Sequence, residues 1–169
     1  MWPRAMMVLL TPLVMLEPES ALRERGSGTA SQAVEFVVVA HDDLGVEDLS
    51  SEQLRRIFLG ERQYWDDGSR ILTLIGAPGT AGRTTVLDLI YDMTEAQYRE
   101  YWIAKIFRTQ TTSGPRMLET DAALLSFVSR LPGSIAVVPA SPDTDGARIL
   151  SIDGLKPGAP GYPLRRSPS

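Results

Sequence analysis

Short apolar runs alternate along the chain with segments in which apolar residues recur at helical spacing. The runs are rich in β-branched residues and have the length of strands, whereas the other segments show the apolar face of a helix. We expect strands at residues 34–40, 71–76, 134–140 and 147–154. We expect helices at residues 51–59, 84–93 and 94–107, and one from residue 120 or 121 to 131. Alternating strands and helices predict an α/β domain, with helices flanking a mixed or mostly parallel sheet.

Two of the expected helices begin with a capping box. Ser50 is followed three residues later by Gln53, and Thr94 is followed in the same way by Gln97. In this pattern the hydroxyl accepts a backbone N–H of the first turn, and the glutamine side chain reaches back to the capping residue. Gly60 follows the first helix, where a left-handed C-terminal residue is expected.

The ends of the chain differ in composition from its centre. Arg4 precedes an apolar stretch at residues 5–16, which predicts a secretion signal and linker at residues 1–30 and a periplasmic or secreted location. The folded domain is expected at residues 33–154, followed by a loose tail rich in Pro, Gly and Arg at residues 155–169. Because the chain has no cysteine, a lipid-modified N-terminal cysteine, disulfides and thiolate metal sites are excluded.

Charge and aromatic residues argue against nucleic-acid binding. The net charge is −4, from 17 basic and 21 acidic residues, and the basic residues are scattered. Tyr98, Tyr101, Trp102 and Ile106 form a stripe on one predicted helix. An aromatic stripe at this spacing is more typical of a core than of a platform that stacks bases or a cofactor, so we expect these residues to face the sheet.

The sequence shows no catalytic constellation. His41 is the single histidine, next to Asp42 and Asp43 just after the first expected strand. Further ligands would be needed for a metal, and no Gly-x-Ser-x-Gly turn is present for a serine nucleophile. The chain is therefore interpreted as a protein without enzymatic activity, metal or cofactor.

The stretch "GAPGTAGRTT" (residues 76–85) joins the second expected strand to a helix. One interpretation is a connector, in which small residues make the turn and Thr84 or Thr85 caps the helix. A second is an anion site formed by Gly79, Thr80, Arg83 and Thr84 at a helix N-terminus. A third is a degenerate nucleotide-binding P-loop, in which Arg83 stands where that motif has its lysine.

Three stretches agree in order and spacing with one protein family. They are "LSSEQLRRIFLGERQYWDDGSRI" (49–71), "YWIAKIF" (101–107) and "LPGSIAVVP" (131–139). The matching residues of the first stretch are Leu49, Ser50, Leu54, Ile57, Phe58, Gly60, Trp65 and Gly68. Over residues 34–154 the chain resembles the phosphate-binding proteins of ABC importers, in a short form with one lobe of the type 2 periplasmic-binding-protein fold.

The resemblance implies an anion site in the turn. Family members that bind phosphate carry an arginine, an acidic residue and a serine-glycine-threonine turn after the second strand. Here Gly79 and Thr80 match, Pro78 replaces the serine, and the preceding arginine and acid are missing; Arg83 supplies a cation from another place. Full receptors close two lobes over the ligand, so one lobe would bind it weakly.

The function implied by the resemblance is an exported domain that binds phosphate or a similar oxyanion weakly, or an accessory module of an ABC-type uptake system. Its partners would be the anion and a membrane transporter or another protein, with no nucleic acid. Two alternatives remain open at this point: the degenerate nucleotide-binding protein, and a protein-interaction domain without a ligand. An exposed apolar patch would favour the latter.

Overall fold

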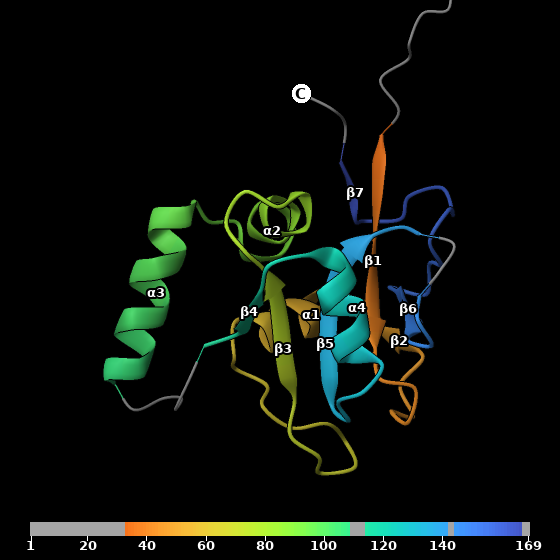
Figure 1. The fold of residues 1–169 in the computed structure, drawn as a ribbon, viewed down its shortest axis with the longest axis horizontal. Coiled ribbons are helices and arrows are strands. Elements are labelled where there is room, and N and C mark those ends of the chain that lie inside the picture. Colours follow the sequence, from red (N-terminus) through yellow and green to blue (C-terminus); the bar gives the residue numbers. More distant parts are fainter. Residues whose placement is uncertain (1–32, 109–113, 142–143, 167–169) are drawn as a thin grey trace, which may run out of the picture. The chain divides into compact units, whose positions relative to one another are not determined.

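The computed structural model describes residues 33–108, 114–141 and 144–166 of the chain (Figure 1). The expected secretion signal at residues 1–30 lies outside them. The strands are β1 (Val34–Ala40), β2 (Asp48–Leu49), β3 (Leu72–Gly76), β4 (Arg116–Leu118), β5 (Ser134–Pro139), β6 (Arg148–Ile152) and β7 (Arg165–Arg166). The helices are α1 (Ser51–Phe58), α2 (Ala81–Val86), the π-helical segment η1 (Leu87–Tyr91) that continues α2, α3 (Glu95–Phe107) and α4 (Asp121–Val128). None of these helices combines the length and hydrophobicity that crossing a bilayer requires.

The described strands form one mixed sheet in the order β2-β6-β1-β5-β3-β4, with β7 paired to β1. β3 is parallel to β4 and β5, and β2 is parallel to β6. β1 is antiparallel to β5, β6 and β7. The prediction of a mixed or mostly parallel sheet is thus confirmed in its first form, a mixed sheet. Because β1 runs against its neighbours, its carboxyl end lies at the opposite end of the sheet from the carboxyl ends of β3 and β5.

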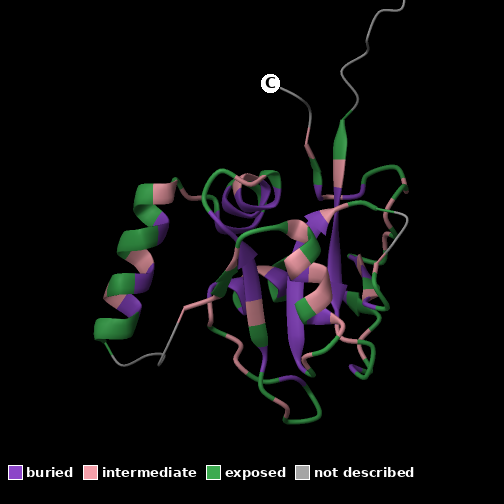
Figure 2. Ribbon diagram, in the orientation of Figure 1, coloured by how far each residue is buried: buried purple, intermediate pink, exposed green. Residues whose placement is uncertain are grey.

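Both faces of the sheet are covered by helices. Phe36, Val38 and Ala40 of β1 belong to a buried cluster with residues of α1, η1 and α3, whereas Val37 and Val39 pack with α4 on the other face. In Figure 1, α4 crosses in front of β5 and α1 lies behind the sheet, and Figure 2 shows the central strands almost wholly buried. Burial on both faces explains the unbroken apolar run in the sequence of β1.

Both capping boxes are confirmed. The Ser50 N–H donates to Gln53 Oε1 at 2.9 Å and the Gln53 N–H donates to Ser50 Oγ at 3.1 Å. The corresponding distances at Thr94 and Gln97 are 2.8 and 3.3 Å. Gly60 follows α1 with φ 66°, as a C-terminal glycine should. The first turns of α1 and α3 are therefore fixed by local sequence alone.

The helix after the turn begins earlier than expected. Its N-cap is Thr80, whose hydroxyl accepts the Arg83 N–H at 3.2 Å, so neither Thr84 nor Thr85 caps it. Thr84 lies inside the helix, where its hydroxyl donates to the Thr80 carbonyl at 3.2 Å. The sequence did not predict this earlier start because glycine at position 82 is an unfavourable residue for a helix. In the folded chain, α2 packs against β3 and β5, and these contacts compensate for the low helical propensity of Gly82.

The aromatic stripe of α3 is confirmed only in part. Tyr98 and Trp102 are buried and Tyr101 is partly buried, whereas the Ile106 side chain is 44% exposed. Figure 2 shows one side of α3 open to solvent. The helix buries a narrower stripe than its sequence predicted.

Residues 155–166 differ from the expected loose tail. Tyr162 and Leu164 are buried in the main core, and the Phe36 N–H donates to the Leu164 carbonyl at 2.9 Å. β7 then pairs with the first residues of β1 (Figure 1). Burial raises the pKa of Tyr162 to about 12. Glycine and proline here make turns in a packed segment, so composition alone was misleading.

Candidate functional site

The β3–α2 turn (residues 77–82) lies at the carboxyl end of β3. The Ala77 N–H donates to the carbonyl of Leu118, the last residue of β4, at 2.8 Å, and the Thr80 N–H donates back to Ala77 at 3.2 Å. Gly79 adopts φ 93°, a left-handed conformation that a side chain would strain. The turn is thus tied to the parallel edge of the sheet, where ligands of open α/β sheets bind.

Several backbone N–H groups at the turn donate to no acceptor among the residues that the structure describes. The hydroxyl of Thr80 accepts from Arg83, and the Thr84 N–H bonds the Thr80 carbonyl at 3.1 Å. Within the described residues, no acceptor is hydrogen-bonded to the N–H groups of Gly79, Ala81 or Gly82. These groups carry the partial positive charge of a helix N-terminus and can receive an anion.

The side chain of Arg83 has a different role from the one predicted. Its guanidinium donates from Nε to Glu95 Oε2 at 3.1 Å and from Nη2 to Glu95 Oε1 at 2.5 Å. It also lies over the Tyr98 ring, with Cζ 4.2 Å from the centroid, and the residue is only 3% exposed. Since both its charge and its ring contact are used inside the domain, Arg83 holds α2 against α3 and does not face the turn as a ligand.

An acidic side chain lies beside the turn. A Cβ built on Gly82 would be 3.2 Å from Asp121 Oδ1 and 3.3 Å from the Val137 carbonyl oxygen, so only glycine fits without displacing a neighbour. Asp121 Oδ1 is buried without a hydrogen-bond partner in the described part of the chain. Burial raises the pKa of Asp121 above its ordinary value. As a carboxylate, Asp121 would weaken the binding of an anion at the turn.

Two kinds of group that a nucleotide-binding P-loop would use, a free cation and a nearby acidic residue from a strand end, are not provided at the turn by the residues considered for them. Arg83, in the position of the P-loop lysine, is paired with Glu95. His41, Asp42 and Asp43 follow the carboxyl end of β1, and the antiparallel pairing of β1 puts them at the other end of the sheet. There, Asp42 pairs with Arg148 at 2.9 Å. No group of three or more His, Asp or Glu side chains among the described residues is arranged to hold a metal.

Sequence reasoning did not identify Glu95 and Asp121 as neighbours of the turn. Glu95 is 12 residues from Arg83 and reaches it from another helix, and Asp121 comes from α4. A buried arginine needs an acidic partner, but the sequence does not indicate which of the acids supplies it. In the sequence, Glu95 is an acidic residue in the first turn of a predicted helix, a position where acidic residues are common, so nothing marks it as the partner of Arg83.

The fold is similar to that of solved phosphate-binding proteins, although no protein-family model matches the sequence. PstS of Borrelia burgdorferi superposes with a TM-score of 0.64 at 14% identity, covering 80% of this chain and 55% of that one. An ABC-type phosphate transport receptor from Vibrio cholerae gives 0.63 at 11% identity, covering 81% and 56%. A protein from Clostridium perfringens, named as a phosphate ABC transporter substrate-binding protein and solved with bound phosphate, gives 0.59 at 15% identity, covering 73% and 47%.

The chain spans about half the length of these proteins. At this identity the similarity establishes the fold and leaves the ligand open. The expected resemblance is confirmed at the level of structure: the chain has the α/β fold of one part of the phosphate ABC transporter substrate-binding proteins, an extent that corresponds to one lobe.

Proposed function

We propose that the chain is a binding protein that takes phosphate or a similar oxyanion at the β3–α2 turn and acts outside the cytoplasm as an accessory module of an ABC-type uptake system. The observation that carries the proposal is the set of backbone N–H groups at Gly79, Ala81 and Gly82 that have no acceptor within the described residues. The fold of proteins named for phosphate binding supports it. Those proteins are binding proteins and not enzymes by name.

The four residues predicted for the site divide into two roles in this proposal. Gly79 contacts the anion through its backbone N–H, and Thr80 shapes the turn, because its N–H and its hydroxyl both donate to the Ala77 carbonyl. Arg83 and Thr84 act from behind the turn, since the first pairs with Glu95 and the second donates its hydroxyl to the Thr80 carbonyl. They position the start of α2 and make no contact with the ligand.

Binding by the chain alone is expected to be weak. Backbone N–H groups at an open turn compete with water for the anion, and each hydrogen bond gains about 0.5–1.5 kcal/mol. The nearby carboxylate of Asp121 opposes the anion, and Arg83, which was expected to balance it, is paired with Glu95. We expect a dissociation constant of about 1 mM, which a second protein that covers the turn would lower.

Thermal unfolding of the full chain tests this function with phosphate, sulfate and Mg-ATP, each against chloride at the same ionic strength. Phosphate at about ten times its dissociation constant should add about 1.4 kcal/mol of stability. An Ala81→Glu variant places a carboxylate at the exposed first position of α2 and should abolish the phosphate effect, while Ala81→Gln should retain it. A shift with Mg-ATP alone would favour the nucleotide-binding alternative, and no shift with any anion would exclude the proposal.

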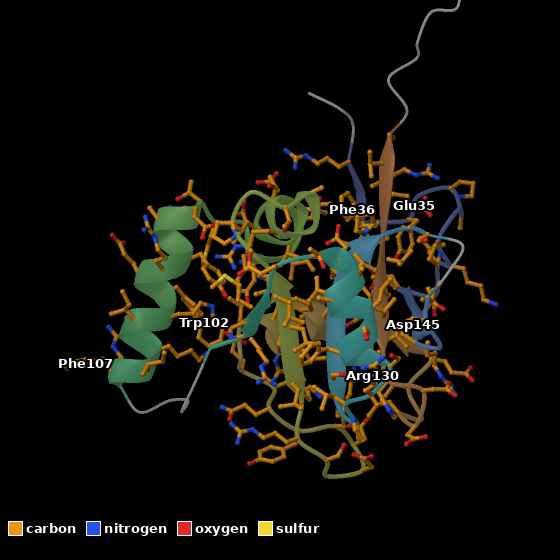
Figure 3. The ribbon with its side chains drawn as sticks, in the orientation of Figure 1. Glu35, Phe36, Trp102, Phe107, Arg130 and Asp145 are labelled. Atoms are coloured by element: carbon orange, nitrogen blue, oxygen red, sulfur yellow. The ribbon has the colours of Figure 1, made fainter. Side chains whose placement is uncertain are left out.

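A second candidate function, a protein-interaction domain without a ligand, is favoured by the outer side of α3. The side chains of Ile103, Ile106 and Phe107 are 66%, 44% and 90% exposed. Figure 3 shows Phe107 pointing away from the rest of the domain. If a second copy of the chain covers this side, sedimentation should detect a dimer that a Phe107→Ser variant abolishes; a monomer in both proteins would count against this candidate.

A further inference from the structure

We propose that the main chain rearranges spontaneously at Asp145–Gly146, where an aspartate-glycine pair converts to isoaspartate while the protein stays folded. The sequence contains two further pairs of this kind, Asp67–Gly68 and Asp153–Gly154, and no asparagine that could give the same product by deamidation. Glycine favours the reaction because it has no side chain to keep its nitrogen away from the carboxyl carbon. The modified loop joins β5 to β6, and the inference does not depend on the proposed function.

The reaction consists of a dehydration followed by a hydrolysis. The nitrogen of Gly146 forms a bond to Cγ of Asp145, while the C–O bond of the protonated carboxyl breaks and its hydroxyl leaves with the amide proton as water. A second water molecule then opens the five-membered imide. Attack of this water at the main-chain carbonyl leaves the chain running through Cγ, with one additional methylene in the backbone and a free α-carboxylate. The only reactant besides the chain is water.

Two of the three pairs occupy the same positions of the same kind of turn. In the turns at Thr144–Ala147 and Ile152–Leu155, the N–H of the fourth residue donates to the carbonyl of the first at 2.9 Å. The central aspartate and glycine have φ 51° and 81° in the first turn and φ 54° and 74° in the second. All four central residues are exposed. A difference in reactivity between these pairs must therefore come from their hydrogen bonds.

The pair Asp153–Gly154 is held on both reacting groups. The Gly154 N–H donates to Asp48 Oδ1 at 2.9 Å. The Ser51 hydroxyl donates to Asp153 Oδ2, and the Ser51 N–H donates to Oδ1 at 2.9 Å. These bonds lower the pKa of Asp153, and an ionised carboxylate has no hydroxyl to lose. The nitrogen and the carboxylate must both leave their partners before the imide can form.

The pair Asp67–Gly68 is held in the same way, although it lies in an exposed turn. The Gly68 N–H donates to the Trp65 carbonyl at 3.0 Å. Asp67 Oδ1 accepts the Ser69 hydroxyl at 2.6 Å and the Ser69 N–H at 2.8 Å, and these two bonds lower the pKa of Asp67. Exposure alone therefore does not make this pair reactive.

The nitrogen of Gly146 is available for the reaction. No acceptor among the residues that the structure describes is hydrogen-bonded to its N–H. A Cβ on Gly146 would meet nothing within 4 Å, so the space beside the residue is open. Asp145 (Figure 3) contacts the Ser129 hydroxyl at 3.5 Å, which is long for an O–H···O bond. Of the three pairs, this one has the free nucleophile.

Isoaspartate at this position changes the packing of the residue that follows. Ala147 is 6% exposed and belongs to the same buried cluster as Leu124 and Val128 of α4. The additional methylene lengthens the turn whose closing hydrogen bond starts at the Ala147 N–H. We therefore expect the modified chain to unfold at a lower urea concentration than the fresh chain.

The test measures isoaspartate at all three pairs in one sample of the full chain. The protein is kept at about pH 5, where more carboxyl groups are protonated than at neutral pH, either folded or unfolded in urea. Trypsin then places the pairs on separate peptides, because Arg70 and Arg148 lie between them, and electron-transfer fragmentation locates the isoaspartate. In the folded chain we expect it at Asp145 about ten times faster than at the other two aspartates, and in urea the three rates should become similar.

Two variants test the role of the free nitrogen. Asp48→Ala removes the acceptor of the Gly154 N–H and should raise the rate at Asp153 several-fold. The control is Glu47→Ala, at an exposed neighbouring position, which should leave that rate unchanged.

A third variant, Asp145→Glu, should give no product at its position, because the longer side chain would have to close a six-membered ring. Four results would each overturn the proposal: equal rates at the three pairs in the folded chain, a fastest rate at Asp67 or Asp153, a difference that persists unchanged in urea, or no response of Asp153 to Asp48→Ala.

Discussion

Arg83 of α2 and Glu95 of α3 form a two-point ion pair, with N–O distances of 3.1 and 2.5 Å, above the ring of Tyr98. The Arg83 side chain is 4% exposed and that of Glu95 is 39% exposed. The pair joins two helices whose sequences give no sign that they touch. It also fixes the start of α2, and therefore the geometry of the turn that precedes it.

The unequal burial of this pair predicts an unequal cost of breaking it. Glu95→Gln leaves a buried guanidinium without its carboxylate and should cost about 2–3 kcal/mol of unfolding free energy. Arg83→Met keeps the buried volume apolar and leaves Glu95 partly in water, so it should cost about 1 kcal/mol. Urea unfolding of both variants measures the difference. A larger loss for Arg83→Met would contradict the assignment of Arg83 as the buried partner.

Gly133 explains the proline-glycine element of the resemblance in physical terms. It has φ 79°, and a Cβ there would lie 2.3 Å from the Arg70 carbonyl oxygen. Gly68 has a similar φ of 82° with nothing within 4 Å of an added Cβ. Gly68→Ala should therefore cost about 1 kcal/mol from backbone strain alone. Gly133→Ala should cost clearly more by the same chemical denaturation, and equal losses would show that the close approach is unimportant.

The packed C-terminal segment is tested by Leu164→Ala. Leu164 is 3% exposed in the main core, so its truncation should cost about 2–4 kcal/mol. Pro160→Ala, at an exposed position of the same segment, should change the unfolding free energy little. If Leu164→Ala were as mild as the control, the original prediction of a loose tail would hold.

Asp121 predicts a pH dependence of stability. Burial raises its pKa in the folded chain above the ordinary value of 3.8, so the folded state binds the proton more tightly than the unfolded state. This contribution to stability is present below the unfolded pKa and is lost as pH rises through the folded pKa. Asp121→Asn should therefore gain stability relative to the parent chain over that rise and keep the gain at neutral pH.

The free energy of unfolding of Asp121→Asn, measured between about pH 3 and 7, tests this dependence, because carboxyl groups titrate within roughly this pH range. Glu119→Gln, at an exposed neighbouring position, is the control. The neutral side chain should also strengthen phosphate binding at the turn, because it removes a nearby negative charge. A variant less stable than the parent at neutral pH would show that the Asp121 carboxylate has a stabilising partner.

The features of this fold that could be predicted from the sequence are those determined by residues close together along the chain. The capping boxes at Ser50 and Thr94 and the apolar run of β1 were readable because each signal lies within a few neighbouring residues. β2, β4 and β7 have only two or three residues each, too few for an alternating pattern to emerge. The prediction of a loose tail after residue 155 was wrong, because a high content of Pro and Gly does not indicate that two side chains of this segment, Tyr162 and Leu164, are buried.

The candidate site was predictable only in its backbone. Small residues between a strand and a helix predicted the turn and its N–H groups, and Gly79 and Thr80 lie where the resemblance indicated. The partners of the side chains depend on tertiary contacts: Glu95 reaches Arg83 from α3, and Asp121 reaches Gly82 from α4. One sequence without its structure gives no means of choosing these acids among the 21 present.

The most direct measurement is a titration of the isotope-labelled full chain with inorganic phosphate at constant ionic strength, followed through its backbone amide signals. The account predicts saturable shifts that are largest at Gly79, Ala81 and Gly82, a dissociation constant of about 1 mM, and their loss in Ala81→Glu but not in Ala81→Gln. Shifts that do not saturate, or that centre on residues away from the turn, would contradict the claim that this turn is an anion site.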